Sequence, residues 1–169
     1  MYWQTVRAVV IFAWFAVPVF AQQASASHPL NSTCTFEDGK EARISYSAFP
    51  DDPKKRELER DKMWTPGNQP MNLFIDGSVS LGGTTIPPGA YSLHLIPSKD
   101  KWTLVVNKDV TPGHEYDPKQ DLVRAPMETG QLPGSQPFQL AFARMKATQC
   151  SLRIYYGKTG VWAEFNEQK

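Results

Sequence analysis

The residues of this chain that could do chemistry are few and widely spaced. Its three histidines lie too far apart in sequence to indicate a catalytic triad, and no hydrolase, phosphate-binding, zinc-protease or dinucleotide-binding motif is present. His114, Glu115 and Asp117 place three potential metal ligands on one loop, but nothing in the sequence fixes their geometry. The sequence therefore predicts no metal site and no cofactor.

A second group of candidates lies near the end of the chain, where two runs of alternating polarity flank Gly157–Gly160. If that turn closes a hairpin symmetrically, Tyr155 faces Trp162 and Arg153 faces Glu164 on the side turned away from the core. Such pairs ordinarily do no more than stabilise a sheet. An exposed Trp with these neighbours also suits stacking on a sugar ring or a peptide, so the four residues are predicted as ligand-binding candidates.

These candidates must be positioned by β-strands. From Ser78 to Asp109, apolar and polar residues alternate between Gly/Pro turns, which is typical of a half-buried antiparallel sheet. We expect three strands in this stretch, with apolar faces at residues 79–81, 91–95 and 102–106. Ser92 and His94 take the opposite phase, so we expect His94 to be a hydrogen-bonded histidine at the surface.

The rest of the chain shows similar short alternating runs. A turn at Glu37–Lys40 predicts an N-terminal hairpin, and matching its apolar faces sets Phe36 opposite Ala42 and Cys34 opposite Ile44. Further strands are predicted at residues 71–75, 122–123, 138–142, 150–156 and 161–165, with connections at 51–62, 64–70, 111–120 and 128–137. The first of these connections is highly charged and is expected to be a solvated excursion.

This pattern predicts an all-β fold. About nine short strands with at most one short helix are typical of an antiparallel β-sandwich. A partly closed β-barrel is the alternative.

The two cysteines, Cys34 and Cys150, fall on the apolar phase of their strands, so both should point into the core. In an exported chain, an even number of cysteines indicates a disulfide. The sequence therefore predicts a Cys34–Cys150 bond, with two buried free thiols as the alternative.

Export itself is indicated by the first residues. One positive charge precedes an apolar run of about a dozen residues, which is short of the length a membrane-spanning helix needs. Small residues then follow where a signal peptidase requires them. We expect a signal peptide over residues 1–21, a flexible leader over 22–32 and one β-sandwich domain over 33–169, in the periplasm or outside the cell. An uncleaved anchor is the alternative, which Pro18 and the short apolar run disfavour.

The charge balance of the mature chain excludes one class of partner. Removing residues 1–21 takes away Arg7 and no acid, so the 18 basic side chains become 17, against 17 acidic ones. No basic stripe remains, and a nucleic acid is therefore not expected as a partner. Once the signal is removed, no membrane span is expected either.

Several stretches follow one another in a familiar order. They are Ile44–Ser47, Trp64 with Gly67, the block IPPGAYSLHLIP at 86–97, the run WTLVVNKD at 102–109, Tyr116–Asp117, and DLVRAPM at 121–127. In combination they resemble a bacterial exported family called domain of unknown function 2911. The resemblance covers nearly the whole mature chain and implies an exported β-sandwich for which no activity is established.

The resemblance also marks two polar loops. In the later loop, Tyr116, Asp117, Asp121 and Arg124 form the best polar constellation, although an Asp and an Arg in a loop more often brace it than do chemistry. General acid–base catalysis would need a positioned pair with shifted pKa values.

In the earlier loop, Trp64, Gly67 and Asn68 match the family pattern, Gln69 stands where Glu is usual, and the usual Arg is absent. If that loop holds a charged site in the family, this chain has lost both the acid and its basic partners, which disfavours catalysis. Trp64 is expected to plug one end of the core.

These observations favour an exported, non-catalytic β-sandwich domain that binds a ligand or an envelope partner. The partner is not identified by the sequence; a glycan or an envelope protein is the expected kind. The alternative is a hydrolase that acts on glycans or other envelope material through a carboxylate pair. Such an enzyme would need a concave cleft in which acids converge.

Overall fold

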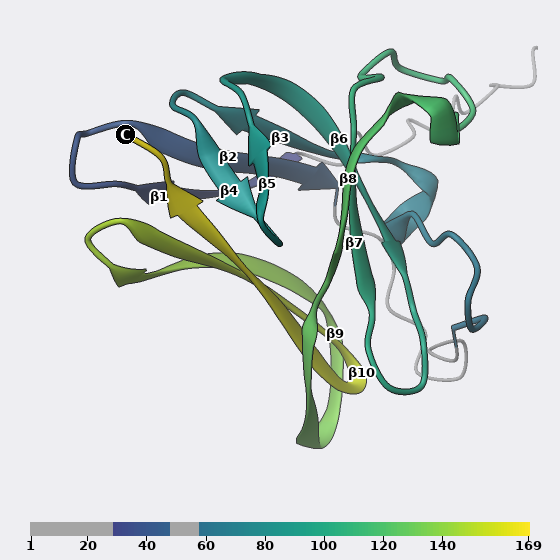
Figure 1. Cartoon of the computed structure of the whole chain (residues 1–169). Helices are drawn as coiled ribbons and strands as arrows, with labels where there is room; N and C mark the ends of the chain where they lie inside the picture. Colours follow the sequence, from purple (N-terminus) through teal and green to yellow (C-terminus); the bar gives the residue numbers. More distant parts are fainter. Residues whose placement is uncertain (1–28, 48–57) are drawn as a thin grey trace, which may run out of the picture.

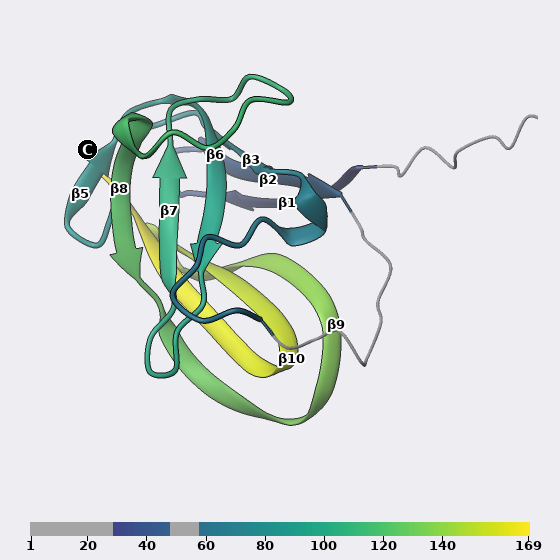
Figure 2. The same ribbon diagram turned by 90° about the vertical axis from the view of Figure 1, so that its right-hand side faces the viewer.

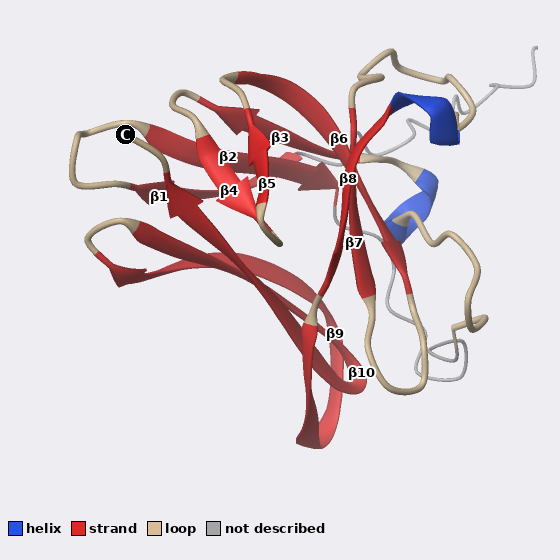
Figure 3. Cartoon of the chain, in the orientation of Figure 1, coloured by secondary structure: helices blue, strands red, loops and turns tan. Residues whose placement is uncertain are grey.

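The structure is a computed structural model that describes residues 29–47 and 58–169. The predicted signal peptide, most of the leader and the first part of the charged run 51–62 lie outside the described residues. Within the described part, ten strands form two antiparallel sheets packed against each other, which confirms the predicted β-sandwich (Figure 1). Two short 3₁₀ turns, Pro66–Asn68 and Pro118–Gln120, are the helical segments of this part (Figure 3).

The larger sheet, sheet A, has the strand order β1-β2-β3-β6-β7-β8 (Figure 2). Its strands are β1 (Pro29–Thr35), β2 (Glu41–Ser47), β3 (Met71–Ile75), β6 (Gly89–Ile96), β7 (Thr103–Asn107) and β8 (Asp121–Pro126). The smaller sheet, sheet B, has the order β5-β4-β10-β9. Its strands are β4 (Val79–Leu81), β5 (Thr84–Ile86), β9 (Glu128–Lys146) and β10 (Gln149–Glu167). The chain therefore changes sheet after β3, after β5 and after β8.

The core lies between the two sheets, where the alternating apolar residues meet. Ile44, Leu73 and Leu93 of sheet A are fully buried, as are Leu152 and Ile154 of sheet B. Each such side chain contributes about 1.5–3 kcal/mol by leaving water. The inward phase predicted for every one of these strands is confirmed.

The central stretch holds four strands rather than the three expected. The additional strand, β5, has one apolar residue, Ile86, among its three residues, so its sequence shows no alternation. It pairs with β4 after a turn at Gly82 and Gly83, which have φ angles of 56° and 84°. These left-handed angles favour glycine, so the two glycines allow the chain to reverse here.

In the N-terminal hairpin the predicted register is wrong by two residues. Cys34 pairs with Ala42 rather than with Ile44, and the Phe36 amide donates to the Lys40 carbonyl at 2.9 Å. The loop is tighter than expected because Gly39 adopts a φ of 84° and closes the turn within three residues. A shift of two residues keeps every side chain on its predicted face.

The predicted connection 128–137 is also wrong, because strand β9 runs through it. β9 lies at the edge of sheet B, where one side of the strand has no partner strand. Pro133 and Pro137 lack an amide hydrogen, which an edge strand tolerates. The Gly and Pro residues of 128–137 therefore lie in an edge strand rather than in a loop.

Strand β10 turns back on itself near Gly157, where the backbone has a φ of 59° (Figure 1). The hydroxyl of Ser151 donates to Glu164 at 3.0 Å, and Gln149 donates to Asn166 at 2.9 Å, across 13 and 17 residues of this strand. A straight strand would separate such partners by roughly 40 Å or more. The two halves of β10 therefore lie side by side.

The predicted disulfide is confirmed. Cys34 on β1 and Cys150 on β10 are bonded, with their Cα atoms 6.1 Å apart. The bond joins sheet A to sheet B and closes a loop of 116 residues. No helix in the described ranges is long and apolar enough to cross a membrane.

Candidate functional site

The outer face of β6 and β7 carries polar side chains that are nevertheless buried. Ser92, His94 and Asn107 are 2%, 7% and 1% exposed. The prediction of a surface histidine at position 94 is therefore wrong. Two loops cover this face, because Thr65 contacts one ring nitrogen of His94 and the Tyr116 ring packs against its imidazole.

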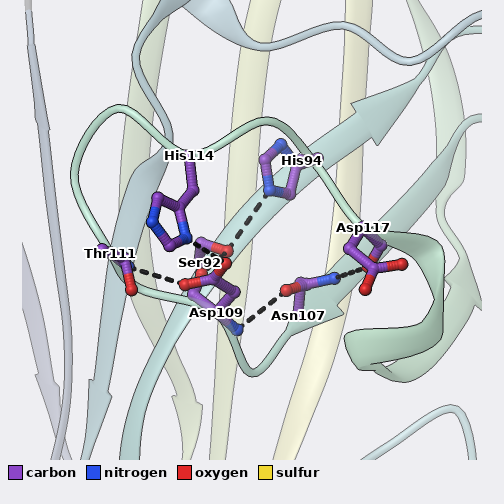
Figure 4. A network of polar contacts seen from close by, with 7 residues as sticks. All are labelled: Ser92, His94, Asn107, Asp109, Thr111, His114 and Asp117. Atoms are coloured by element: carbon purple, nitrogen blue, oxygen red, sulfur yellow. Dashed lines mark hydrogen bonds and ion pairs between the residues drawn. The ribbon is translucent and has the colours of Figure 1, made fainter.

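Hydrogen bonds determine the protonation of His94 (Figure 4). The Ser92 hydroxyl donates to the Asp109 carbonyl at 2.7 Å, so it can only accept from His94 Nε2, which lies 3.3 Å away. The proton is therefore on Nε2, and Nδ1 accepts from the Thr65 hydroxyl at 3.1 Å. Burial lowers the pKa of His94, and the charge of Asp121 opposes this shift more weakly. His94 is thus a neutral residue that links the two loops.

The later loop closes around Asp121. The Tyr116 hydroxyl donates to Asp121 Oδ2 at 2.6 Å, and Arg124 Nε donates to the same oxygen at 2.7 Å. Arg124 also donates to the Tyr116 oxygen at 2.7 Å, and Asn107 donates to Asp121 Oδ1 at 2.9 Å. Three of the four residues marked in this loop therefore meet.

The fourth residue, Asp117, has a different role. Its carboxylate accepts from the Lys119 amide at 3.0 Å and so caps the short 3₁₀ turn that follows. Its backbone carbonyl accepts from Asn107 at 2.9 Å (Figure 4). Asp117 therefore shapes the loop, and its side chain does not join the group around Asp121.

Electrostatics within this group oppose acid–base catalysis. Burial, followed by the hydrogen bond to Asp121, raises the pKa of Tyr116 to about 12. Burial alone would raise the pKa of Asp121, but hydrogen bonds from Tyr116, Asn107 and Arg124 outweigh it and keep that pKa below its usual value. A glycosidase acid needs a raised pKa instead. Asp121 is therefore a fixed anion that braces the loop.

Ser92 and His94 also lack the geometry of a nucleophile and its base. The Ser92 proton is directed to the Asp109 carbonyl rather than to the imidazole, and its oxygen is buried. An activated serine must instead give its proton to the base and meet the substrate. This pair therefore fixes β6 against the loop after β7.

Beside this network lies a cleft of about 420 Å³. We call it the outer cleft; it is lined by Asn68, Gln69, Pro70, Asn72, Val110, Pro112, Gly113 and His114. A smaller depression of about 20 Å³ shares Pro70 and His114 with it and reaches Ser92 and His94. The two loops that the sequence singled out separately therefore form one concave surface.

His114 is held at the mouth of the outer cleft by Asp109. His114 Nδ1 lies 3.0 Å from Asp109 Oδ2, and the imidazole is 61% exposed (Figure 4). Hydrogen bonds from Thr111, and then from His114, lower the pKa of Asp109 to about 2. In the described ranges no three His, Cys, Asp or Glu side chains converge as metal ligands, so His114, Glu115 and Asp117 do not form such a group.

Trp64 belongs to the same loop as Asn68 but turns away from the cleft. Its ring packs edge-on against Trp102 and Phe138, at centroid distances of 5.9 and 5.8 Å, and against Tyr156 at 5.0 Å. Its backbone exchanges hydrogen bonds with Leu95. Trp64 thus packs against the core, as expected of a side chain that closes one end of it.

The charged candidates on β10 do not pair as predicted. Glu164 accepts from Ser151 rather than meeting Arg153, so the hairpin register differs by two residues from the symmetric one. Arg153 instead donates to the sulfur of Met145 at 3.1 Å. The turn at Gly157 comes earlier than symmetric closure around 157–160 requires, which accounts for the shift.

The aromatic candidates on β10, Tyr155 and Trp162, likewise do not face each other as predicted. The Tyr155 ring covers Gly160, where an added Cβ would lie 3.1 Å from it. The Trp162 ring covers Gly130 of β9, where an added Cβ would lie 3.2 Å away. The predicted Tyr155–Trp162 pair is therefore replaced by two rings that each pack over a glycine, and neither ring lines the outer cleft.

Sequence reasoning missed Ser92, Asn107 and Asp109 as members of the network. The available signal was the polar phase of β6 and the Asn-Lys-Asp run that ends β7. That signal identifies a polar face but not the loops that cover it.

The comparisons place these residues in a known family. The family described as Protein of unknown function (DUF2911) matches residues 31–165. That range includes both loops, the outer cleft and both cysteines. Neither a curated protein nor a solved structure matches the chain. Because the match spans most of the sequence, this chain belongs to the DUF2911 family.

Proposed function

We propose that this chain is an exported, non-catalytic binding domain whose ligand occupies the outer cleft. Residues 1–21 are its signal peptide and one folded domain follows; residues 29–32 of the predicted leader belong to β1, so this domain begins earlier than the predicted residue 33. The Cys34–Cys150 disulfide supports an oxidising, non-cytoplasmic compartment. N-terminal sequencing of the exported protein, which should begin near Gln22, tests the first boundary.

The observation that carries the proposal is that the outer cleft lies beside a hydrogen-bond network that fixes the loops lining it. The Thr65–His94–Ser92 hydrogen bonds connect the earlier loop to β6 and to the backbone of Asp109. A concave site held in place before binding loses little conformational entropy when a ligand arrives. This network therefore supports ligand binding without requiring any of its members to react.

The lining of the outer cleft indicates the class of ligand. Asn68, Gln69 and Asn72 offer amide donors and acceptors, and Val110 and Pro112 offer apolar contact. Within residues 29–47 and 58–169, no carboxylate, lysine or arginine lines it. An uncharged ligand rich in hydroxyl groups suits such a surface, so the proposed ligand is a neutral glycan.

The test is binding of purified mature protein to an array of neutral oligosaccharides, followed by calorimetry on the best ligand. Gln69→Ala combined with His114→Ala should weaken binding at least tenfold. Asn68 is left unchanged because its φ of 56° would strain an alanine. The matched control is Gln139→Ala, an exposed amide on β9, which should bind as the parent does.

An unchanged affinity in the Gln69/His114 variant would show that the outer cleft is not the binding site. Hydrolysis of any oligosaccharide in the array, abolished by Asp121→Asn, would overturn the non-catalytic assignment. The expected result is binding without turnover.

A further inference from the structure

A second cleft, of about 320 Å³, shares no lining residue with the outer cleft. It lies where residues 58–60, the turn between β6 and β7 and the turn within β10 meet, and Gln131 of β9 also lines it. The two turns lie at the same end of the sandwich (Figure 1). We call it the basic cleft; it is lined by Leu58, Arg60, Pro97, Ser98, Lys99, Trp102, Gln131, Tyr156, Gly157, Lys158 and Thr159.

Each of the three segments brings one cation to this cleft. They are Arg60, Lys99 and Lys158, and no Asp or Glu of the described part of the chain lines this cleft. The acids nearest to them in sequence, Glu59, Asp61 and Asp100, do not line the cleft.

The three cations of the cleft differ from neighbouring cations in their ion pairing. Lys62 pairs with Glu59, and Lys101 pairs with Glu128. Arg60, Lys99 and Lys158 form no ion pair with any residue in the described ranges. Among the described residues, the cations that face the cleft are thus without an anionic partner, while the neighbouring Lys62 and Lys101 are neutralised.

Three like charges around one concavity repel one another unless an anion lies between them. A cleft also focuses the field of the charges that line it, which raises the local concentration of anions. The lining also contains uncharged hydrogen-bond donors, namely Ser98, Thr159 and Gln131. The geometry points to a binding site for a small oxyanion, a carboxylate or a phosphate group, independent of the proposed glycan site.

The experiment is an NMR titration of ¹⁵N-labelled mature protein. Inorganic phosphate and D-glucuronate are added in separate titrations, with D-glucose as the uncharged control. We expect saturable shifts of the amides of Gly157, Lys158 and Thr159 with at least one anion, and none with glucose. The anion that produces these shifts distinguishes a phosphate ligand from a carboxylate ligand, and shifts with both assign the site to oxyanions in general.

Two triple variants that remove equal charge distinguish binding of an anion in the basic cleft from general electrostatic attraction to the protein. Arg60→Gln with Lys99→Gln and Lys158→Gln should weaken anion binding at least tenfold. Lys108→Gln with Lys119→Gln and Lys146→Gln removes the same charge from exposed lysines outside the cleft and should change the affinity less than twofold.

Equal loss in the two triple variants, or the absence of saturable shifts at the three amides with both anions, would overturn the proposal. The Gln69→Ala/His114→Ala variant should keep its anion affinity in full. This last result makes failure of the basic cleft distinguishable from failure of the outer cleft.

Discussion

At the scale of single residues, Asp109 shows how one side chain can fix a loop. Its carboxylate accepts from the Thr111 amide at 2.9 Å and lies 3.0 Å from His114 Nδ1, and its carbonyl accepts from Ser92. The side-chain contacts favour the charged form of the carboxyl, which is why its pKa falls to about 2. The loop that lines the outer cleft therefore depends on Asp109 being ionised.

The resulting pH dependence has a definite sign. Because the folded-state pKa lies below the unfolded value of about 3.9, this group stabilises the fold above pH 4. That contribution is lost as the pH falls from about 4 toward 2. Urea unfolding between pH 6 and pH 2 should show a smaller loss of stability in this window for Asp109→Asn than for the parent. Parallel curves for the two proteins would contradict this assignment.

At the scale of elements, the bridge between Trp64 and Leu95 attaches the earlier loop to sheet A. The indole then packs against Phe138 of β9, Tyr156 of β10 and Trp102, which immediately precedes β7. Favourable edge-to-face pairs add about 0.5–1.5 kcal/mol each to the burial of apolar surface. The loop that presents Asn68 and Gln69 to the outer cleft is therefore anchored from the core side.

Truncation of this anchor should be costly. We expect Trp64→Ala to lower the free energy of unfolding by about 3 kcal/mol, near the lower end for a buried Trp because the ring is half-buried. The comparison is Trp162→Ala, which removes a ring packed over Gly130 and should cost about 1 kcal/mol. Chemical denaturation of both variants measures the difference; equal costs would mean that Trp64 is not an anchor.

At the scale of the whole molecule, the disulfide joins the first described strand of sheet A to β10 of sheet B. A bond that closes 116 residues removes much of the freedom of the unfolded chain. It therefore holds the two sheets together independently of the contacts between their inner faces.

The size of this effect follows from the loop length. The chain-entropy relation gives about 4–5 kcal/mol for a loop of this size, so Cys34→Ala with Cys150→Ala should lose about that much stability. Guanidinium unfolding measures the loss, and dithiothreitol should destabilise the parent but not the double variant. A loss below about 1 kcal/mol would show that the unfolded chain is already constrained without the bond.

Much of the fold could be predicted from the sequence because a period of two is a local property. Leu152, Ile154, Val161 and Phe165 lie at alternate positions of their strand segments, and that pattern alone indicates which side of each segment meets the core. The same alternation predicted that both cysteines point inward, and this supported the prediction of the disulfide between them. The family resemblance likewise rested on short stretches of sequence.

The tertiary structure decided three features: the registers of the hairpins, the loops that cover the outer face of β6, and the two clefts. Both hairpins differ from their predicted pairings by two residues, because Gly39 and Gly157 close the turns earlier, and a shift of two leaves the apolar pattern unchanged. His94 is buried because loops remote in sequence lie over an outer face whose polarity suggested solvent. The outer cleft and the basic cleft each join distant segments, and such long-range contacts leave no periodic trace in the sequence.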